Sequence, residues 1–174
     1  MRISINNILE FHKLRTQCHI DCVNYFAGLL GYHFPEHDND KMKDPICTGY
    51  AYKNYAEYHK KFNFLQQYKD LFNVAWNTHH QTNSHHIENY TDVTQISKIC
   101  LIEMVCDWFS ACSEQLLLNK NEYSCVKDWF DNTMLNLSWT DTQLQTIYQT
   151  IDYIEKHADF NCVNHIWNNV LIDL

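Results

Sequence analysis

The sequence is poor in the residues that end helices and form turns. It contains three glycines and two prolines in 174 residues. All-β folds use both residue types in their many turns, so this scarcity argues against a sandwich or barrel and favours long helices with few connections. No segment alternates apolar and polar residues as a half-buried strand does. We therefore expect an all-α protein in which residues 1–174 form a single helical bundle around one core.

Long apolar runs are also missing. No segment approaches the roughly 18 apolar residues of a membrane span, and Glu10, His12 and Lys13 interrupt the apolar residues that a signal peptide would need near the N-terminus. We expect no membrane association and an intracellular, cytoplasmic location. None of the eight cysteines forms a CxxC pair, which disfavours a zinc ribbon, and in that compartment the thiols would stay reduced.

Positive charge is scarce. The formal net charge is −8 with histidine counted as neutral. Attraction to the phosphates of nucleic acid is therefore weak, and we do not expect nucleic acid as a partner. Bound divalent cations would offset part of this charge.

Periodic apolar residues predict the helices. We expect a first helix over about 11–30, a second over about 51–72 and a third that starts near 72. A fourth should run from Thr91 or Thr94 to about 118, followed by a short helix over about 123–136 and a last one over about 140–156. Residues 32–50 are expected to be irregular. The sequence TDTQ at 140–143 is typical of a capping box.

Three polar residues fall on apolar faces of these helices. His19 lies on the apolar stripe of the first helix, and Glu103 and Asp107 lie one turn apart on the apolar face of the fourth. Buried charges are usually paired or bound to metal. A hydrogen-bonded core histidine remains the alternative for His19, and a face misjudged by one position remains the alternative for the two carboxylates.

Two short stretches concentrate further candidate ligands. EHDNDK at 36–41 contains His37, Asp38 and Lys41, and WNTHHQTNSHHIENY at 76–90 contains His79, His80, Asn83, His85 and His86. In a helix, the first histidine, the asparagine and the last histidine would share one face, and His80 is expected to face solvent. A solvated, polar helix end is the alternative for the second stretch, and a solvated loop lysine is the alternative for Lys41.

The order of these residues along the chain resembles the ligand order of the HD superfamily of metal-dependent phosphohydrolases. Their all-helical domain contains a first histidine, an adjacent His-Asp pair and a later aspartate. The extra histidines between the pair and the last aspartate resemble the binuclear members, which include the HD-GYP phosphodiesterases and the mixed-valent diiron oxygenases. The GYP element is absent from this sequence.

A closer resemblance covers about residues 17–110. The sequence has H-I-x-x-V at 19–23, H-D-x-x-K at 37–41, W-x-x-H-x-x-x-N-x-H-H at 76–86 and E-M-x-C-D-W at 103–108. This combination is similar to family 5662 among the domains of unknown function. The members of that family are small proteins of bacteria and viruses. The resemblance implies an HD-like fold and a metal site, and it implies no particular substrate.

The site that these resemblances imply has two divalent transition-metal ions. One ion would bind His19, His37 and Asp107, the other His79, His85 and His86, and Asp38 would bridge them. Imidazole with carboxylate suits Fe, Mn, Co, Ni or Zn. Lys41 and Asn83 would orient a phosphate, and Glu103 would accept an imidazole N–H of a ligand.

Three functions are compatible with such a site. The first is hydrolysis of a nucleotide or another small phosphate ester by a metal-activated water. The second is the chemistry of an HD-type diiron oxygenase, which would cleave a C–C or C–P bond. The third is a non-catalytic metal-binding helical module. The tyrosines at 50–58 either stack a base or pack the core or a homo-oligomer interface, and packing is the simpler interpretation.

Overall fold

The computed structural model describes residues 4–59, 62–63, 65–120 and 125–171, and over these residues it contains helices and turns but no strand. The expected all-α class is confirmed. The α-helices are α1 (Ile5–Leu29), α2 (Ile46–Tyr58), α3 (Gln66–Thr82), α4 (Lys98–Leu117), α5 (Val126–Thr133), α6 (Asp141–His157) and α7 (Phe160–Leu171). Short 3-10 helices lie at η1 (Asn39–Met42), η2 (Ile87–Asn89) and η3 (Val93–Gln95).

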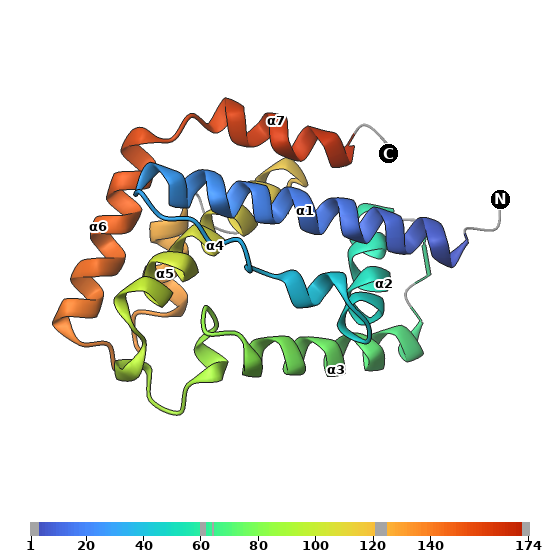
Figure 1. Ribbon diagram of the computed structural model, residues 1–174, viewed down its shortest axis with the longest axis horizontal. Helices are drawn as coiled ribbons and strands as arrows, with labels where there is room; N and C mark the ends of the chain where they lie inside the picture. Colours follow the sequence, from blue (N-terminus) through green and yellow to red (C-terminus); the bar gives the residue numbers. More distant parts are fainter. Residues whose placement is uncertain (1–3, 60–61, 64, 121–124, 172–174) are drawn as a thin grey trace.

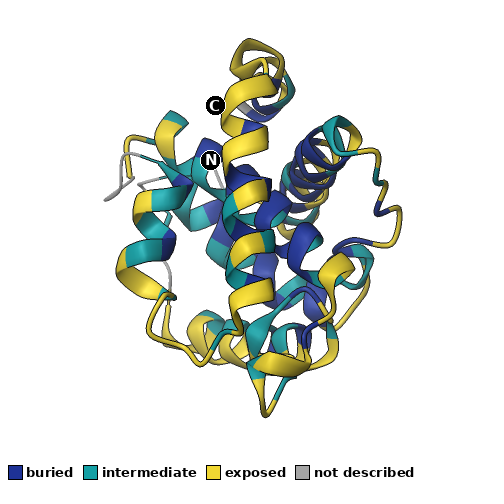
Figure 2. Cartoon of the chain, turned by 90° about the vertical axis from the view of Figure 1, so that its left-hand side faces the viewer, coloured by how far each residue is buried: buried dark blue, intermediate teal, exposed yellow. Residues whose placement is uncertain are grey.

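Helix α1 is the centre of the bundle. It packs against α2, α4 and α7, and α7 runs alongside it (Figure 1). The buried faces of the helices point toward the middle of the molecule (Figure 2). One hydrophobic cluster contains residues of α1, α2, α4, α5, α6 and α7. A smaller cluster of Ile46, Tyr50 and Ala75 joins α2 to α3. The second cluster is what fixes α3 to the rest of the bundle.

Local sequence explains where the main helices begin and end. The Ser4 side chain accepts a hydrogen bond from Asn7 N at the start of α1. After its last turn, Gly31 adopts φ 78°, and the N–H groups of Gly31 and Tyr32 donate to the carbonyls of Gly28 and Ala27. This pattern is a Schellman motif, in which glycine supplies the left-handed residue.

Two cap predictions have different outcomes. Helix α6 begins with the expected capping box, because Thr140 and Gln143 exchange side-chain-to-backbone hydrogen bonds. The expected cap of α4 at Thr91 or Thr94 is wrong, because Ser97 accepts from Cys100 N. Residues 93–95 form η3 instead and leave the helix to start at 98.

The helix expected over 51–72 is also wrong, because two helices occupy this region. Helix α2 starts at Ile46 and ends at Tyr58, and α3 starts at Gln66. Tyr52 stacks on Tyr68 with ring centroids 4.0 Å apart. The aromatic side chains therefore pack α2 against α3, in keeping with the packing interpretation.

Helix α7 was not expected from the sequence. Its buried residues Val163, Trp167 and Val170 recur at spacings of four and three and are at most 1% exposed. The short fifth helix ends at Thr133, and its expected start at Tyr123 lies outside the described residues.

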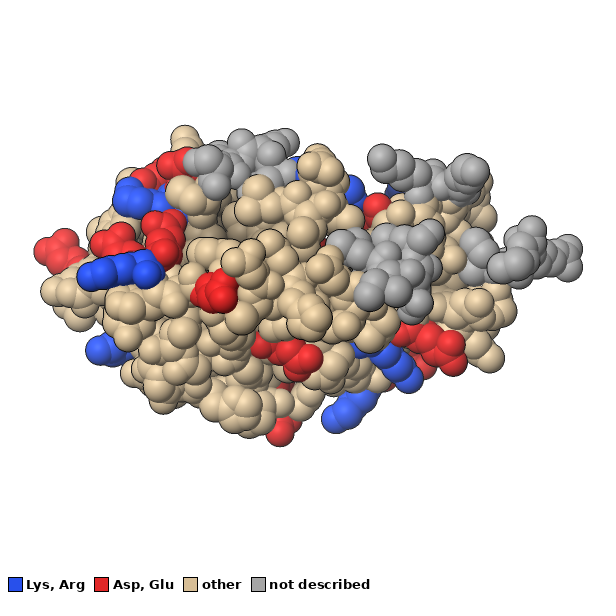
Figure 3. Space-filling model, turned by 90° about the horizontal axis from the view of Figure 1, so that it is seen from above, with Lys and Arg blue, Asp and Glu red and all other residues tan. Residues whose placement is uncertain are grey.

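Over the described part of the chain, no helix is both long enough and apolar enough to cross a membrane. On the face shown in Figure 3, lysine and arginine side chains are scattered among aspartates and glutamates.

Candidate metal centre

Asp38 lies at the middle of the candidate site. It precedes η1 with φ 57° and is fully buried. Its Oδ1 atom lies 3.2 Å from His79 Nε2 and 3.5 Å from His85 Nε2. Its Oδ2 atom lies 3.4 Å from His19 Nε2 and 2.7 Å from Lys41 Nζ. The two carboxylate oxygens therefore face two different groups of imidazoles, and a left-handed backbone is tolerated here because aspartate is short and polar.

The first group of imidazoles and carboxylates brings together three segments: α1, α4 and the turn that precedes η1. His19 Nε2 lies 2.9 Å from Asp107 Oδ1 and 3.4 Å from His37 Nε2. The possible ligand atoms of these three residues all lie within 4.8 Å of one another. Sequence analysis assigned the same three residues to one ion.

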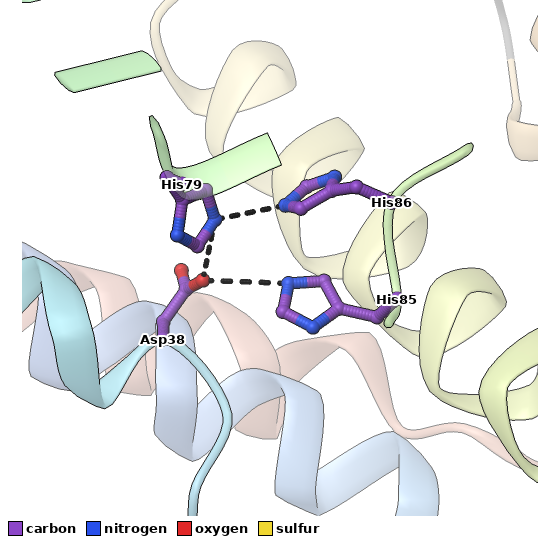
Figure 4. A group of neighbouring side chains, drawn as sticks. All are labelled: Asp38, His79, His85 and His86. Atoms are coloured by element: carbon purple, nitrogen blue, oxygen red, sulfur yellow. Dashed lines mark hydrogen bonds and ion pairs between the residues drawn. The ribbon is translucent and has the colours of Figure 1, made fainter. Parts of the chain in front are cut away.

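The second group contains Asp38, His79, His85 and His86 (Figure 4), with possible ligand atoms again within 4.8 Å of one another. His86 Nε2 lies 2.8 Å from His79 Nε2. Because α3 ends at Thr82, only His79 is helical. A continuous helix, which would have put His86 on the same face as His79, is therefore not formed. The loop after α3 turns back and brings both later histidines to the site.

The Nδ1 atoms of these imidazoles are held from outside the site. His37 Nδ1 lies 2.9 Å from Glu103 Oε1, and His79 Nδ1 lies 2.8 Å from Asp40 Oδ2. A carboxylate that accepts from Nδ1–H fixes the tautomer whose Nε2 lone pair faces inward, as in metal sites. This position is the one that sequence analysis expected for Glu103, which also approaches His85 Nδ1 at 3.5 Å.

Asp40 and Ser110 are contributors that sequence analysis missed. The Ser110 hydroxyl donates to the His19 carbonyl at 3.2 Å, so it accepts from His19 Nδ1 at 2.9 Å. Asp40 belongs to the HDND stretch, where an acidic neighbour of the His-Asp pair was a usable signal. Ser110 lies three residues after Asp107 on α4, and nothing in its sequence context distinguishes it from a solvated serine.

Two buried atoms at the centre lack a hydrogen-bond partner among the described residues. They are Asp38 Oδ1 and His85 Nε2, which lie 3.5 Å apart. Leaving such groups unsatisfied is costly, and a cation bound by both would satisfy them. The donor set of imidazoles and carboxylates suits divalent Fe, Mn, Co, Ni or Zn. The residues present therefore fit a transition-metal site.

The protonation states also suit metal binding. Burial opposes the charged form of Asp38, but Lys41 and His37 outweigh it and hold the pKa of Asp38 well below its usual range. The pKa of Asp107 is likewise well below its usual range, because its interaction with His19 outweighs burial. Burial lowers the pKa of His19 and of His86. Charged carboxylates and neutral imidazoles are the forms that bind metal.

His37 differs from the other histidines. Burial disfavours its charged form, but Asp38 and Glu103 outweigh burial and raise the pKa of His37. It therefore holds a proton to a higher pH than a free histidine, and a metal must displace that proton.

Lys41 and Asn83 make contacts within the site. Lys41 is buried. Its ammonium contacts Asp38 and lies 5.0 Å from the centroid of the Tyr50 ring. The Asn83 amide donates to Asp40 Oδ2 and to the His79 carbonyl, each at 2.8 Å. In this structure Lys41 compensates the charge of Asp38, and Asn83 holds Asp40 beside His79.

The expectation that His80 faces solvent is wrong. Its side chain is 16% exposed and stacks between Trp76 and His86, with ring centroids 3.9 and 3.8 Å apart respectively. His80 Nδ1 also lies 3.2 Å from Glu88 Oε2. The ring of His80 therefore packs directly on the ring of His86 and supports it.

His12 is a buried histidine that sequence analysis did not single out. Its Nε2 lies 2.9 Å from the Lys41 carbonyl, and the Asn54 amide lies 2.9 Å from its Nδ1. The amide donates, so Nε2 carries the proton and donates to the carbonyl. Burial lowers the pKa of His12 to about 4. Its position seven residues before His19, on the same face of α1, is the signal that could have revealed it.

A pocket of about 330 Å³ opens beside the centre. His37, His85 and Glu103 belong to both the site and the pocket wall. The remaining lining residues are His33, Phe34, Pro35, Glu36, Thr82, Asn83 and Ser84. The turn after α1 and the loop after α3 therefore form opposite walls of a space that reaches the candidate ligands.

Fold and site together define an all-helical protein with a buried cluster of histidines and carboxylates of the kind that binds transition metals. The sequence model of the family described as "Family of unknown function (DUF5662)" matches residues 9–160, and the chain belongs to this family. The matched segment contains all the residues of the candidate metal centre. No curated protein matches the chain, and no solved structure does.

Proposed function

We propose that this protein is an HD-type, metal-dependent phosphohydrolase that acts on a small phosphate ester. The observation that carries the proposal is the position of Asp38, whose Oδ1 faces His79 and whose Oδ2 faces His19 at 3.2 and 3.4 Å. A carboxylate shared between two groups of imidazoles is suited to two ions that act on one substrate. The adjoining pocket gives a small molecule access to both groups.

In this proposal His19, His37 and Asp107 would hold one ion, His79, His85 and His86 would hold the other, and Asp38 would contribute to both. When bound, such ions lower the pKa of water and withdraw charge from phosphoryl oxygens.

The chain's own groups orient the ligands and handle the proton. Glu103 and Asp40 fix the rings of His37 and His79 through Nδ1. Lys41 keeps Asp38 charged in a buried position. The pair of His37 Nδ1 and Glu103 Oε1 holds a proton on the wall of the pocket, where a leaving alkoxide would need one.

The proposal is tested by phosphate release from a panel of phosphate esters. The protein is purified without chelator and assayed with Fe, Mn, Co, Ni or Zn. We expect turnover with at least one metal and a loss of at least about 100-fold in His85→Asn, because a buried ligand is removed. His157→Asn, on an exposed part of α6, is the matched histidine control and is expected to keep full activity.

Each alternative function has its own outcome in this experiment. Oxygen-dependent loss of substrate without phosphate release would favour the diiron oxygenase. Metal that stabilises the fold without any turnover would favour the non-catalytic module. Phosphate release that survives in His85→Asn would contradict the proposed site.

A further inference from the structure

We infer that the pocket beside the metal centre takes a small phosphomonoester that carries no second anionic group. This inference rests on the proposed function and names its substrate class. It depends on the size of the pocket and on the charges of its wall.

The pocket is small and is continuous with the metal centre. Its volume of about 330 Å³ is near the lower end of the roughly 300–1,000 Å³ range of ligand sites. His37 and His85 present their rings to it from the two groups. A phosphoryl group directed at these histidines places the organic part of the ester between the turn at 33–36 and the loop at 82–84.

One carboxylate of the pocket wall has no ion-pair partner among the described residues. The ten residues that line the pocket, all of them described, include Glu36 and Glu103 but no lysine or arginine. Glu103 is paired with His37, whose Nδ1 lies 2.9 Å from its Oε1, so the carboxylate that remains is that of Glu36. Lys41 does not line the pocket. Its ammonium is directed at Asp38 instead and lies 2.7 Å from Oδ2. A phosphate ester with a further carboxylate or phosphate would bring that charge toward Glu36 without a cation to meet it.

The ions themselves do not change this conclusion. The carboxylates of Asp38, Asp40, Glu103 and Asp107 surround the two groups of imidazoles. With Lys41 beside Asp38, a centre holding two divalent ions would keep a small positive charge, which a phosphoryl dianion would more than offset. Glu36 is exposed and lies on the outer part of the wall. A second anionic group beside Glu36 would be disfavoured by about tenfold in a partly screened site. Nucleoside polyphosphates and dinucleotides are disfavoured by their additional charges.

Binding without turnover tests the charge requirement directly. The probes are 3-hydroxypropylphosphonate and 3-phosphonopropionate, which have the same three-carbon length and differ by a carboxylate. Calorimetry on the metal-loaded protein, at low salt and without oxygen, gives the two Kd values. We expect tighter binding of the hydroxyl compound by about tenfold, with a difference that shrinks as salt is added. Equal affinity, or tighter binding of the carboxylate compound, would overturn the inference.

Turnover and a charge-reversal variant give a second measurement. We expect kcat/KM for glycerol 3-phosphate to exceed that for 3-phosphoglycerate by about tenfold, and that for ATP by more. Glu36→Lys is expected to remove or reverse the preference in both assays. Glu10→Lys makes the same change of charge at an exposed residue of α1 outside this pocket, and is expected to keep the preference.

The outcomes separate this inference from the proposed function. If phosphate esters are hydrolysed but 3-phosphoglycerate or ATP is the better substrate, the proposed function stands and this inference fails. If Glu36→Lys keeps the full preference, the pocket wall is not its cause and the inference fails. If neither phosphonate binds and no ester is hydrolysed, the proposed function itself fails.

Discussion

At the scale of single residues, the two central aspartates have different surroundings. Asp38 is fully buried and forms a close ion pair with Lys41. Asp107 contacts His19 and His37, and among the described residues its ion-pair partners are these histidines. From the sequence alone, both carboxylates would be stabilised only by cations. The ion pair with Lys41 means that the two should respond differently to substitution.

Lys41→Met tests this difference. In chelator, the substitution leaves the carboxylate of Asp38 buried without its ammonium, and we expect a loss of about 3–5 kcal/mol in the free energy of unfolding. The double variant Asp38→Asn/Lys41→Met removes both charges and should recover most of that loss. Asp107→Asn should also destabilise the protein in chelator, because it removes the interaction with His19 that lowers the pKa of Asp107. It leaves no buried charge without a partner, however, and should cost less than Lys41→Met. Chemical unfolding with chelator and with added metal measures all three.

Added metal supplies the control for the aspartate variants. A cation near Asp38 replaces the missing ammonium, so metal should reduce the destabilisation of Lys41→Met and should do little for the double variant. A Lys41→Met protein as stable as the parent in chelator would show that the buried pair contributes nothing.

His12 predicts a pH dependence of the apo-protein. Burial lowers its pKa to about 4, below the value of about 6.5 in an unfolded chain. The unfolded chain therefore binds the proton first, and the contribution of His12 to stability is complete above pH 6.5 and is lost as the pH falls toward 4. The expected slope is up to about 1.4 kcal/mol per pH unit. His12→Asn should remove this slope when unfolding is measured in chelator at pH 7, 6 and 5.

His157→Asn again controls for the replacement of a histidine as such, because His157 is exposed on α6. An unchanged slope in His12→Asn would mean that His12 does not stay neutral in the folded protein. The groups around the ring of His12 are the Lys41 carbonyl, Asn54, Thr16 and Tyr50, so its variant also tests how α1 holds the turn that carries Asp38.

At the scale of helices, the packing of α2 on α3 positions His79. A Cβ atom added to Gly49 would overlap Ala75 and lie 2.7 Å from the Leu71 carbonyl oxygen. Glycine is therefore needed at 49 because the two helices approach closely. Both opposing residues are on α3, one turn or two before His79.

Gly49→Ala and Gly28→Ala are a matched pair that tests this contact. Both glycines are helical, but a Cβ atom at 28 meets nothing within 4 Å. We expect Gly28→Ala to be neutral or to stabilise by roughly 0.5–1 kcal/mol. Gly49→Ala should destabilise by about 1–3 kcal/mol and weaken metal binding by moving α3. Thermal unfolding and metal titration measure both effects, and equal behaviour of the two variants would contradict the close approach.

Some elements could be predicted from the sequence because a local pattern determines them. The capping box at Thr140 and the apolar stripe of α1 around His19 are examples. The break between α2 and α3 could not be predicted, because no glycine or proline marks residues 59–65 and the aromatic pattern continues across it. Helix α7 was missed because its buried residues are few and gain their partners only when α7 packs on α1.

At the scale of the whole molecule, the site joins segments far apart in the sequence. α1, the turn at 37–41, the end of α3 and α4 each contribute candidate ligands. Their order along the chain, together with the family resemblance, predicted the residues that the fold brings together. It could not supply Ser110 or the support of His86 by His80, because these contacts depend on side-chain packing and not on a motif. Asp40 could have been found as the acidic neighbour of the His-Asp pair.

The two groups should release metal at different pH values. Protons compete with metal for imidazole, and His37, whose pKa is raised by Asp38 and Glu103 against burial, takes up its proton first as the pH falls. Burial lowers the pKa of His86, so the second group resists protons longer. We expect the first ion to be lost at a higher pH than the second as the pH is lowered from 7.5. Metal retained after dialysis at each pH measures this, and release of both ions in one step below pH 4 would contradict it.

The central claim is that the buried histidines and carboxylates bind metal, and elemental analysis tests it most directly. Protein purified without chelator, supplied with transition metal and then freed of excess ion at pH 7.5 should retain about two ions per chain, because the ligands form two groups around Asp38. His85→Asn should retain fewer, and His157→Asn should retain as many as the parent. Finding no bound transition metal in the parent protein under these conditions would contradict the account.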